Sequence, residues 1–292
     1  MVIKNIFFIS YFVERIIANF IMRTSFYIVE LSMSKSTKDF HSVIKDRTSL
    51  KWSEATFEYI FSFFFATVLF IIFSLYLFNR RGFYDLYIIN KVFAGVAIFQ
   101  LGIALLIGPL CRMFDVFDRT LRFRKEFGII AFFFAVLHGV SSLFFLKSYF
   151  PIEKYLTTGI IPFAFGLVGI ITLIFIFLIS NKKSMNIIGF KRWWIIQYWG
   201  VRAAFLVVAL HVFVMKMPGW IDWYKKGGAS TLAHPEWPGL GLLEGWFIFF
   251  VILIRIAEAI NINLGRFIWY ISVLALPLIY FLTFIWGRRF LP

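Results

Sequence analysis

The chain has 292 residues, of which 61% are hydrophobic and 22% aromatic but only 15% charged, and its mean hydropathy is +0.84. These values exclude an ordinary soluble domain and predict an integral membrane protein, an all-α polytopic helix bundle. The formal net charge of +15 does not indicate nucleic-acid binding, because the basic residues are scattered between apolar runs and form no compact basic face.

The first 55 residues form a separate N-terminal segment. Residues 3–33 are apolar overall, but charged side chains interrupt them and no small-residue cleavage site follows, so a secretory signal peptide is not expected. We predict an amphipathic helix that lies at the membrane interface. A polar cytoplasmic linker over residues 33–53 would join it to the spans.

Seven later stretches each contain about 20 mostly apolar residues, the length that a membrane-spanning helix needs. We predict spans at 56–78, 89–109, 127–146, 157–180, 194–215, 240–261 and 267–286. Residues 56–215 would form the main bundle, and residues 216–292 an outer loop at 216–239 with two additional spans. Alternate connections carry eighteen Lys and Arg residues on one side and ten on the other, which predicts a cytoplasmic N-terminus.

Two histidines, His138 and His211, fall inside predicted spans that run in the same direction. Their depths follow from the rise of 1.5 Å per residue, with Arg202 taken as the cytoplasmic interface of the fifth span. His211 then lies about 14 Å deep and His138 about 16 Å deep. Ionisable side chains within a membrane mark function by default, so both imidazoles are candidate ligands.

Two imidazoles at one depth on separate helices can each give a ring nitrogen to one haem iron. Ligation of both axial positions favours electron transfer over oxygen binding. The alternative is two unrelated histidines that each hydrogen-bond a neighbouring helix carbonyl. The single cysteine, Cys111, allows no internal disulfide and no cysteine-rich metal site.

The sixth predicted span carries Arg255 and Glu258, which lie three residues apart on one helix face. The two charges can neutralise each other toward the interior of the bundle. Alternatively, they can form a polar wall for a quinone head group or a proton path.

A compound motif occupies residues 109–145, PLCRMFDVFDRTLRFRKEFGIIAFFFAVLHGVSSLFF. The segment begins with the end of a span, a Pro-Leu-Arg-like sequence, and continues into a basic loop. A basic pair, Arg124 and Lys125, then leads through Gly128 and an aromatic stretch to His138.

A second motif, FKRWWIIQYWGVRAAFLVVALH, covers residues 190–211 and contains Trp194 and His211. Together the two motifs resemble the ferric-reductase-like transmembrane domain family, in which these positions hold a tryptophan and the last haem histidine. The resemblance covers residues 56–215. Within the family it is greatest to the haem-bearing membrane subunits of periplasmic methionine sulfoxide reductase systems.

The main departure from that subgroup is Tyr198, which stands where a further histidine precedes the last one by thirteen residues. The resemblance therefore implies one haem b at His138 and His211 and a second haem without its expected ligand. Tyr198 could itself ligate iron, or it could be an aromatic residue of the membrane interface. Arg202 could contact a haem propionate, or it could serve as an interfacial anchor.

What the resemblance implies is a multi-pass cytochrome of a prokaryotic plasma (inner) membrane. Its electron donor would be membrane quinol, which we prefer, or a cytoplasmic flavin reductase, and its acceptor an extracytoplasmic oxidoreductase. The chain would be an electron-transfer subunit rather than a complete enzyme. The rival interpretation is a haem-free transporter or membrane assembly protein of the same outline.

Overall fold

The computed structural model describes residues 52–291, and this part of the chain is helical with no strand. Seven of its helices are long and apolar enough to cross a membrane. The predicted fold class, an all-α polytopic bundle, is therefore confirmed. The predicted interfacial helix and linker fall on residues 1–51, which lie outside the described residues.

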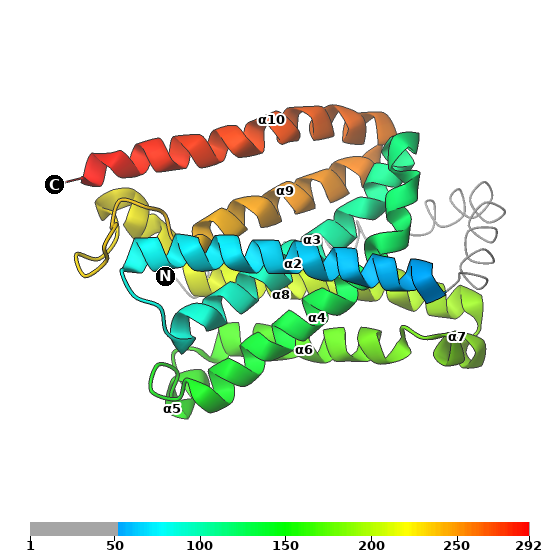
Figure 1. Cartoon of the computed structure of the whole chain (residues 1–292), viewed down its shortest axis with the longest axis horizontal. Helices are drawn as coiled ribbons and strands as arrows, with labels where there is room; N and C mark the ends of the chain where they lie inside the picture. The colour runs from blue at the N-terminus through cyan, green and yellow to red at the C-terminus, as the bar shows by residue number, and fades with distance from the viewer. Residues whose placement is uncertain (1–51, 292) are drawn as a thin grey trace, which may run out of the picture.

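The spanning segments alternate in direction along the bundle (Figure 1). They are α2 (Trp52–Arg81), α3 (Leu86–Met113), α4 (Arg124–Val140), α6 (Ile160–Ile179), α8 (Phe190–Lys226), α9 (Leu240–Ile260) and α10 (Ile262–Gly287). The π-helical η2 (Ser141–Phe145) prolongs α4. Short helices lie in the connections: η1 (Asp115–Phe123), α5 (Ile152–Leu156) and α7 (Lys182–Ile188). A further short helix, η3 (Arg288–Phe290), follows α10.

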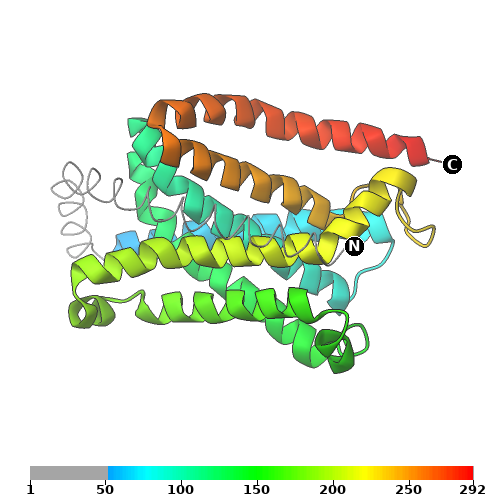
Figure 2. The same ribbon diagram turned by 180° about the vertical axis from the view of Figure 1, so that it is seen from behind.

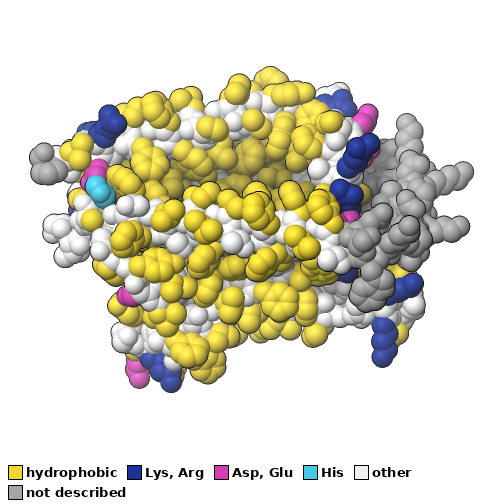
Figure 3. Space-filling view, in the orientation of Figure 1, with side chains coloured by type: hydrophobic (Ala, Val, Ile, Leu, Met, Phe, Trp, Pro, Cys, Tyr) yellow, Lys and Arg dark blue, Asp and Glu magenta, His cyan; other side chains and the backbone are white. Residues whose placement is uncertain are grey.

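We call the end of the bundle with η1 and α7 the η1 end, and the opposite end, with α5 and the C-terminus, the α5 end (Figure 1). A belt of apolar side chains covers the visible face between them, and most Lys and Arg side chains lie at the two ends (Figure 3). Such a surface is stable in a bilayer, where apolar side chains meet lipid and charged ones meet water.

Helix α3 is the centre of the bundle. In its most apolar stretch 67% of the residues are buried, against 11% in α10. It packs on α2, α4, α8, α9 and α10, and the rings of Phe99 and Phe247 stack at 4.1 Å between α3 and α9. Helices α6 and α8 form a second pair, side by side in both views (Figures 1 and 2).

One boundary differs from the sequence-based expectation. The predicted outer loop at 216–239 is helical in its first half, because α8 continues through Pro218 and ends only at Lys226. Buried Trp223 holds this extension against the rest of the chain, and Gly227 stops it with a φ of +77°. Tertiary packing therefore overrides the turn signals of this segment.

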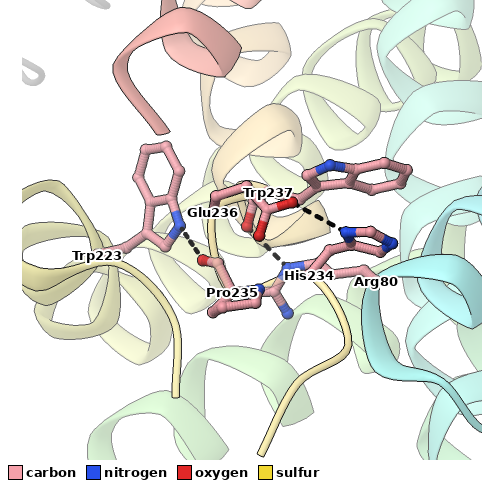
Figure 4. Close-up of polar contacts among 6 residues, drawn as sticks. All are labelled: Arg80, Trp223, His234, Pro235, Glu236 and Trp237. Atoms are coloured by element: carbon pink, nitrogen blue, oxygen red, sulfur yellow. Dashed lines mark hydrogen bonds and ion pairs between the residues drawn. The ribbon is translucent and has the colours of Figure 1, made fainter. Parts of the chain in front are cut away.

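The remaining loop, residues 227–239, closes back on the end of α2 (Figure 4). Arg80 Nε donates to the backbone oxygen of Trp237 at 3.0 Å, and the backbone N–H of His234 donates to the backbone oxygen of Arg80 at 3.0 Å. His234 also contacts Glu236, with 2.9 Å between Nδ1 and Oε1. These contacts place His234 at the α5 end, away from the membrane interior.

Candidate functional site

His138 lies near the end of α4 and is fixed from α3. Its Nδ1 is 2.9 Å from the side-chain oxygen and 3.1 Å from the backbone oxygen of Asn90. Asn90 is buried, and its amide nitrogen donates to Ser142 Oγ at 2.9 Å, which identifies Oδ1 as the atom that faces the histidine. Because both oxygens are acceptors, Nδ1 carries the proton and Nε2 keeps its lone pair.

His211 has the same arrangement on α8. Its Nδ1 lies 2.6 Å from the carbonyl oxygen of Pro162 in the first turn of α6, so Nδ1 donates and Nε2 again keeps its lone pair. Gly166, one turn further along α6, makes room for the ring, because a Cβ there would lie 3.1 Å from Nδ1. The sequence therefore permits a close approach of α6 and α8 at this level.

Each imidazole is only half-buried, and both lie toward the α5 end: His138 near the end of α4, and His211 against the first turn of α6. Within residues 52–291 no three His, Cys, Asp or Glu side chains gather as a site for a bare metal ion. Haem iron needs only two protein donors, and neutral imidazoles oriented through Nδ1 are suitable ones. As a donor set, His138 and His211 therefore suit a haem.

Tyr198 and Arg202 lie elsewhere on α8, toward the η1 end. The Arg202 guanidinium lies 3.2 Å from the centroid of the Tyr198 ring, and its Nη1 donates to the Tyr198 backbone oxygen at 2.5 Å. Along α8, Arg202 is about 14 Å from His211. The four predicted site residues thus divide into a histidine pair and a separate Tyr–Arg stack.

An arginine cluster surrounds this stack at the η1 end. Glu258 of α9 pairs with Arg112 of α3 and, at 3.3 Å, with Arg255, and Arg255 lies close to Tyr198. The predicted Arg255–Glu258 pair is confirmed. The sequence did not indicate Arg112 as its third member, since its contact with Glu258 depends on how α3 packs on α9.

Beside this cluster lies a cavity of about 510 Å³, which we call the inner cavity. Helices α3, α4, α6, α7 and α8 all contribute to its walls. Its lining includes aromatic and basic side chains, among them Arg124, Lys125, Phe132, Phe177, Lys182, Trp193, Trp194 and Tyr198. Such a volume falls in the range typical of small-molecule sites.

Sequence reasoning missed the groups that orient the histidines. Asn90 is an amide at the start of an apolar run, which could have marked it as a partner for an intramembrane imidazole. The carbonyl of Pro162 leaves no signal in the sequence, because every residue has a backbone oxygen.

Residues 93–208 match the family of ferric reductase like transmembrane components. The matched segment begins on α3, contains all of α4 with His138, and ends on α8 three residues before His211. It is shorter than the expected range of 56–215 and leaves out α2. No curated protein matches the chain.

Proposed function

We propose that the chain is a membrane cytochrome that passes electrons through one haem b held by His138 and His211. The observation that carries the proposal is that the two imidazoles have the same tautomer. Each donates its Nδ1–H to an oxygen acceptor and keeps Nε2 for a metal. Bound there, haem b would supply reversible one-electron transfer. The family match to ferric reductase like transmembrane components supports this function.

The chain's own residues have three tasks in this function. Asn90 and Pro162 hold the two rings in one tautomer and one orientation, as do the groups that orient metal-bound histidines. His138 and His211 would hold the haem, and a haem held by two imidazoles would supply electron transfer in preference to oxygen binding. The apolar side chains of α4, α6 and α8 would surround the haem and limit its contact with water.

In this proposal the chain is an electron-transfer subunit in a prokaryotic plasma membrane. Membrane quinol is the preferred donor over a cytoplasmic flavin reductase, since a single haem about 14–16 Å deep is best reached from within the membrane. The acceptor is an extracytoplasmic oxidoreductase. The resemblance to membrane subunits of periplasmic methionine sulfoxide reductase systems favours an acceptor of that kind. The N-terminus then lies in the cytoplasm.

Absorption spectroscopy of the purified chain tests the proposal. Protein from haem-replete cells should be red, with a Soret band that shifts and α and β bands that sharpen on reduction with dithionite. A colourless preparation would instead support a haem-free transporter or assembly protein.

Replacement of Asn90 by leucine should weaken haem retention by about 10–100-fold, the usual cost of losing a group that orients a metal-bound histidine. The reason is that Nδ1 of His138 loses its side-chain acceptor and the ring is no longer fixed by Oδ1. The rate of haem transfer to apomyoglobin measures the effect. Asn79→Leu is the matched control, because Asn79 is exposed and bonds only the preceding turn of α2. Equal rates for the two variants would contradict the assigned role.

A further inference from the structure

We propose that the inner cavity binds one anionic phospholipid, with the head-group phosphate at a basic mouth and part of an acyl chain in an apolar interior. The inference goes beyond the proposed function, because lipid binding needs neither a haem nor an electron donor. It gives an occupant to a cavity that the histidine pair, His138 and His211, does not line.

The mouth of the inner cavity carries positive charge. Arg124, Lys125 and Lys182 line it, and within the described part of the chain no Asp or Glu does. Lys125 and Lys182 are exposed, and Arg124 is half-buried at the start of α4. None of the three forms an ion pair with another described residue. A phosphate at the mouth therefore meets three cations and no competing carboxylate.

The arginine cluster behind the mouth adds to this charge. Tyr198 joins the two, because its ring lies under the Arg202 guanidinium and also lines the cavity. Arg112 and Arg255 share the carboxylate of Glu258, and among the described residues no other Asp or Glu pairs with either of them. An excess of guanidinium groups at the edge of a membrane is costly, and a bound anion stabilises it.

The lining becomes apolar toward the interior of the bundle. There it is formed by Ile129 and Phe132 of α4, Leu173 and Ile176 of α6, and Val201 of α8. Along α6 the lining runs from Leu173 to Ser180, about 10 Å at 1.5 Å per residue. An acyl chain needs only apolar contacts, without a free ring face or a hydrogen bond, so this interior can hold part of one.

The surroundings of the inner cavity favour a lipid over a soluble phosphate. Phe133 and Leu178, which follow the lining residues Phe132 and Phe177, are 51% and 62% exposed, and in a membrane such side chains contact lipid. A soluble anion would bind the basic mouth but leave the apolar interior empty. An amphiphile can occupy both parts.

The position of the mouth in the membrane agrees with an anionic lipid. Helix α2 begins at the η1 end, where Phe57 contacts Phe123 of η1 with ring centroids 6.2 Å apart. With the cytoplasmic N-terminus of the proposed function, the mouth then lies in the cytoplasmic leaflet. Basic pockets between spans on this side of a membrane bind anionic head groups.

The inner cavity offers no ligand pair for a second haem. Among the described residues that line it, none is a histidine or a cysteine. Tyr198, the position at which the resemblance places a histidine, has one ring face covered by the Arg202 guanidinium at 3.2 Å. A phospholipid needs no such ligands, so the lining suits it better than a haem.

Matched charge variants test the mouth. The double variant Arg124→Gln, Lys182→Gln removes two cations from the lining. Its control, Lys183→Gln, Arg192→Gln, removes the same charge from two exposed residues outside the lining. A difference between the two double variants therefore reports the place of the charge and not its amount.

Gly128 gives a separate test of the apolar interior. It lies in the lining, and a Cβ at this position meets no atom within 4 Å, so the ring of Gly128→Phe should enter the cavity without displacing the helix. Gly219→Phe is the matched control, because Gly219 also has open space around its Cβ but lies on α8 at the α5 end.

Native mass spectrometry of the purified chain, titrated with dioleoylphosphatidylglycerol, measures the binding. We expect one tightly bound lipid in the wild type and in both controls. The charge variant should bind it about thirtyfold more weakly, as expected for two lost cations, and Gly128→Phe about tenfold more weakly. Dioleoylphosphatidylcholine, which has the same chains, should bind the wild type about as weakly as dioleoylphosphatidylglycerol binds the charge variant. Equal binding of the two lipids, or of the variants and their controls, would overturn the site.

Inorganic phosphate distinguishes a lipid from a soluble anion. We expect millimolar phosphate to leave dioleoylphosphatidylglycerol bound, whereas its displacement would overturn the lipid in favour of a phosphate site. If the double variant does not fold, Lys182→Gln alone should weaken binding about fivefold relative to Lys183→Gln, since both side chains are exposed on α7. A preparation that binds the lipid but contains no haem would contradict the cytochrome and leave this site intact.

Discussion

Alanine at either His138 or His211 should abolish the reduced haem spectrum of the purified protein. Each variant leaves one imidazole, and the remaining one cannot hold a low-spin, six-coordinate iron by itself. The acceptor that oriented the removed ring would then have no ring to bind: Asn90 in His138→Ala and Pro162 in His211→Ala. Absorption spectra of the dithionite-reduced proteins, normalised to protein concentration, measure the loss.

His234→Ala is the control for this experiment. Its side chain is 46% exposed and pairs with Glu236 in the loop at the α5 end, so its removal should leave the spectrum unchanged. Retention of the full wild-type spectrum in either His138→Ala or His211→Ala would contradict the assigned ligands.

Glu258→Gln should destabilise the bundle by about 3–5 kcal/mol, the cost of breaking a buried ion pair by removing one partner. The carboxylate is 3% exposed and serves both Arg112 and Arg255. Without it, two guanidinium groups face each other and the nearby Arg202 at the η1 end. Thermal unfolding in detergent, followed by tryptophan fluorescence, would report a large decrease in midpoint temperature.

Asp222→Asn provides the comparison. Asp222 pairs with Lys226 at 3.7 Å, and the two side chains are 62% and 71% exposed, so the change should cost at most about 1 kcal/mol. If Glu258→Gln and Asp222→Asn lower the midpoint equally, the cluster does not stabilise the fold in the way proposed.

The spans could be predicted because lipid imposes a length and a composition on each of them. The same rules failed at the end of α8. There Pro218 and the polar residues after it resemble a loop, but buried Trp223, which contacts the distant Phe290, keeps the segment helical. Such contacts depend on the packing of the whole bundle and are absent from any local pattern.

The candidate site divides in the same way. Depth and residue type single out His138 and His211, because an imidazole within an apolar run is unusual, and their role as haem ligands stays a prediction. Their hydrogen-bond partners, Asn90 and Pro162, and the inner cavity depend on helix rotation and on the approach of α6 to α8. For Tyr198 the sequence left two roles open, and the stack with Arg202 became visible only in three dimensions.

The haem content of the purified chain tests the central claim most directly. Protein from haem-replete cells, assayed as the pyridine haemochrome against protein concentration, should contain one haem b per chain. That result would agree with a single pair of oriented imidazoles, His138 and His211, and with an inner cavity that lacks a second pair of ligands. A content of two haems per chain, or of none, would contradict the proposal.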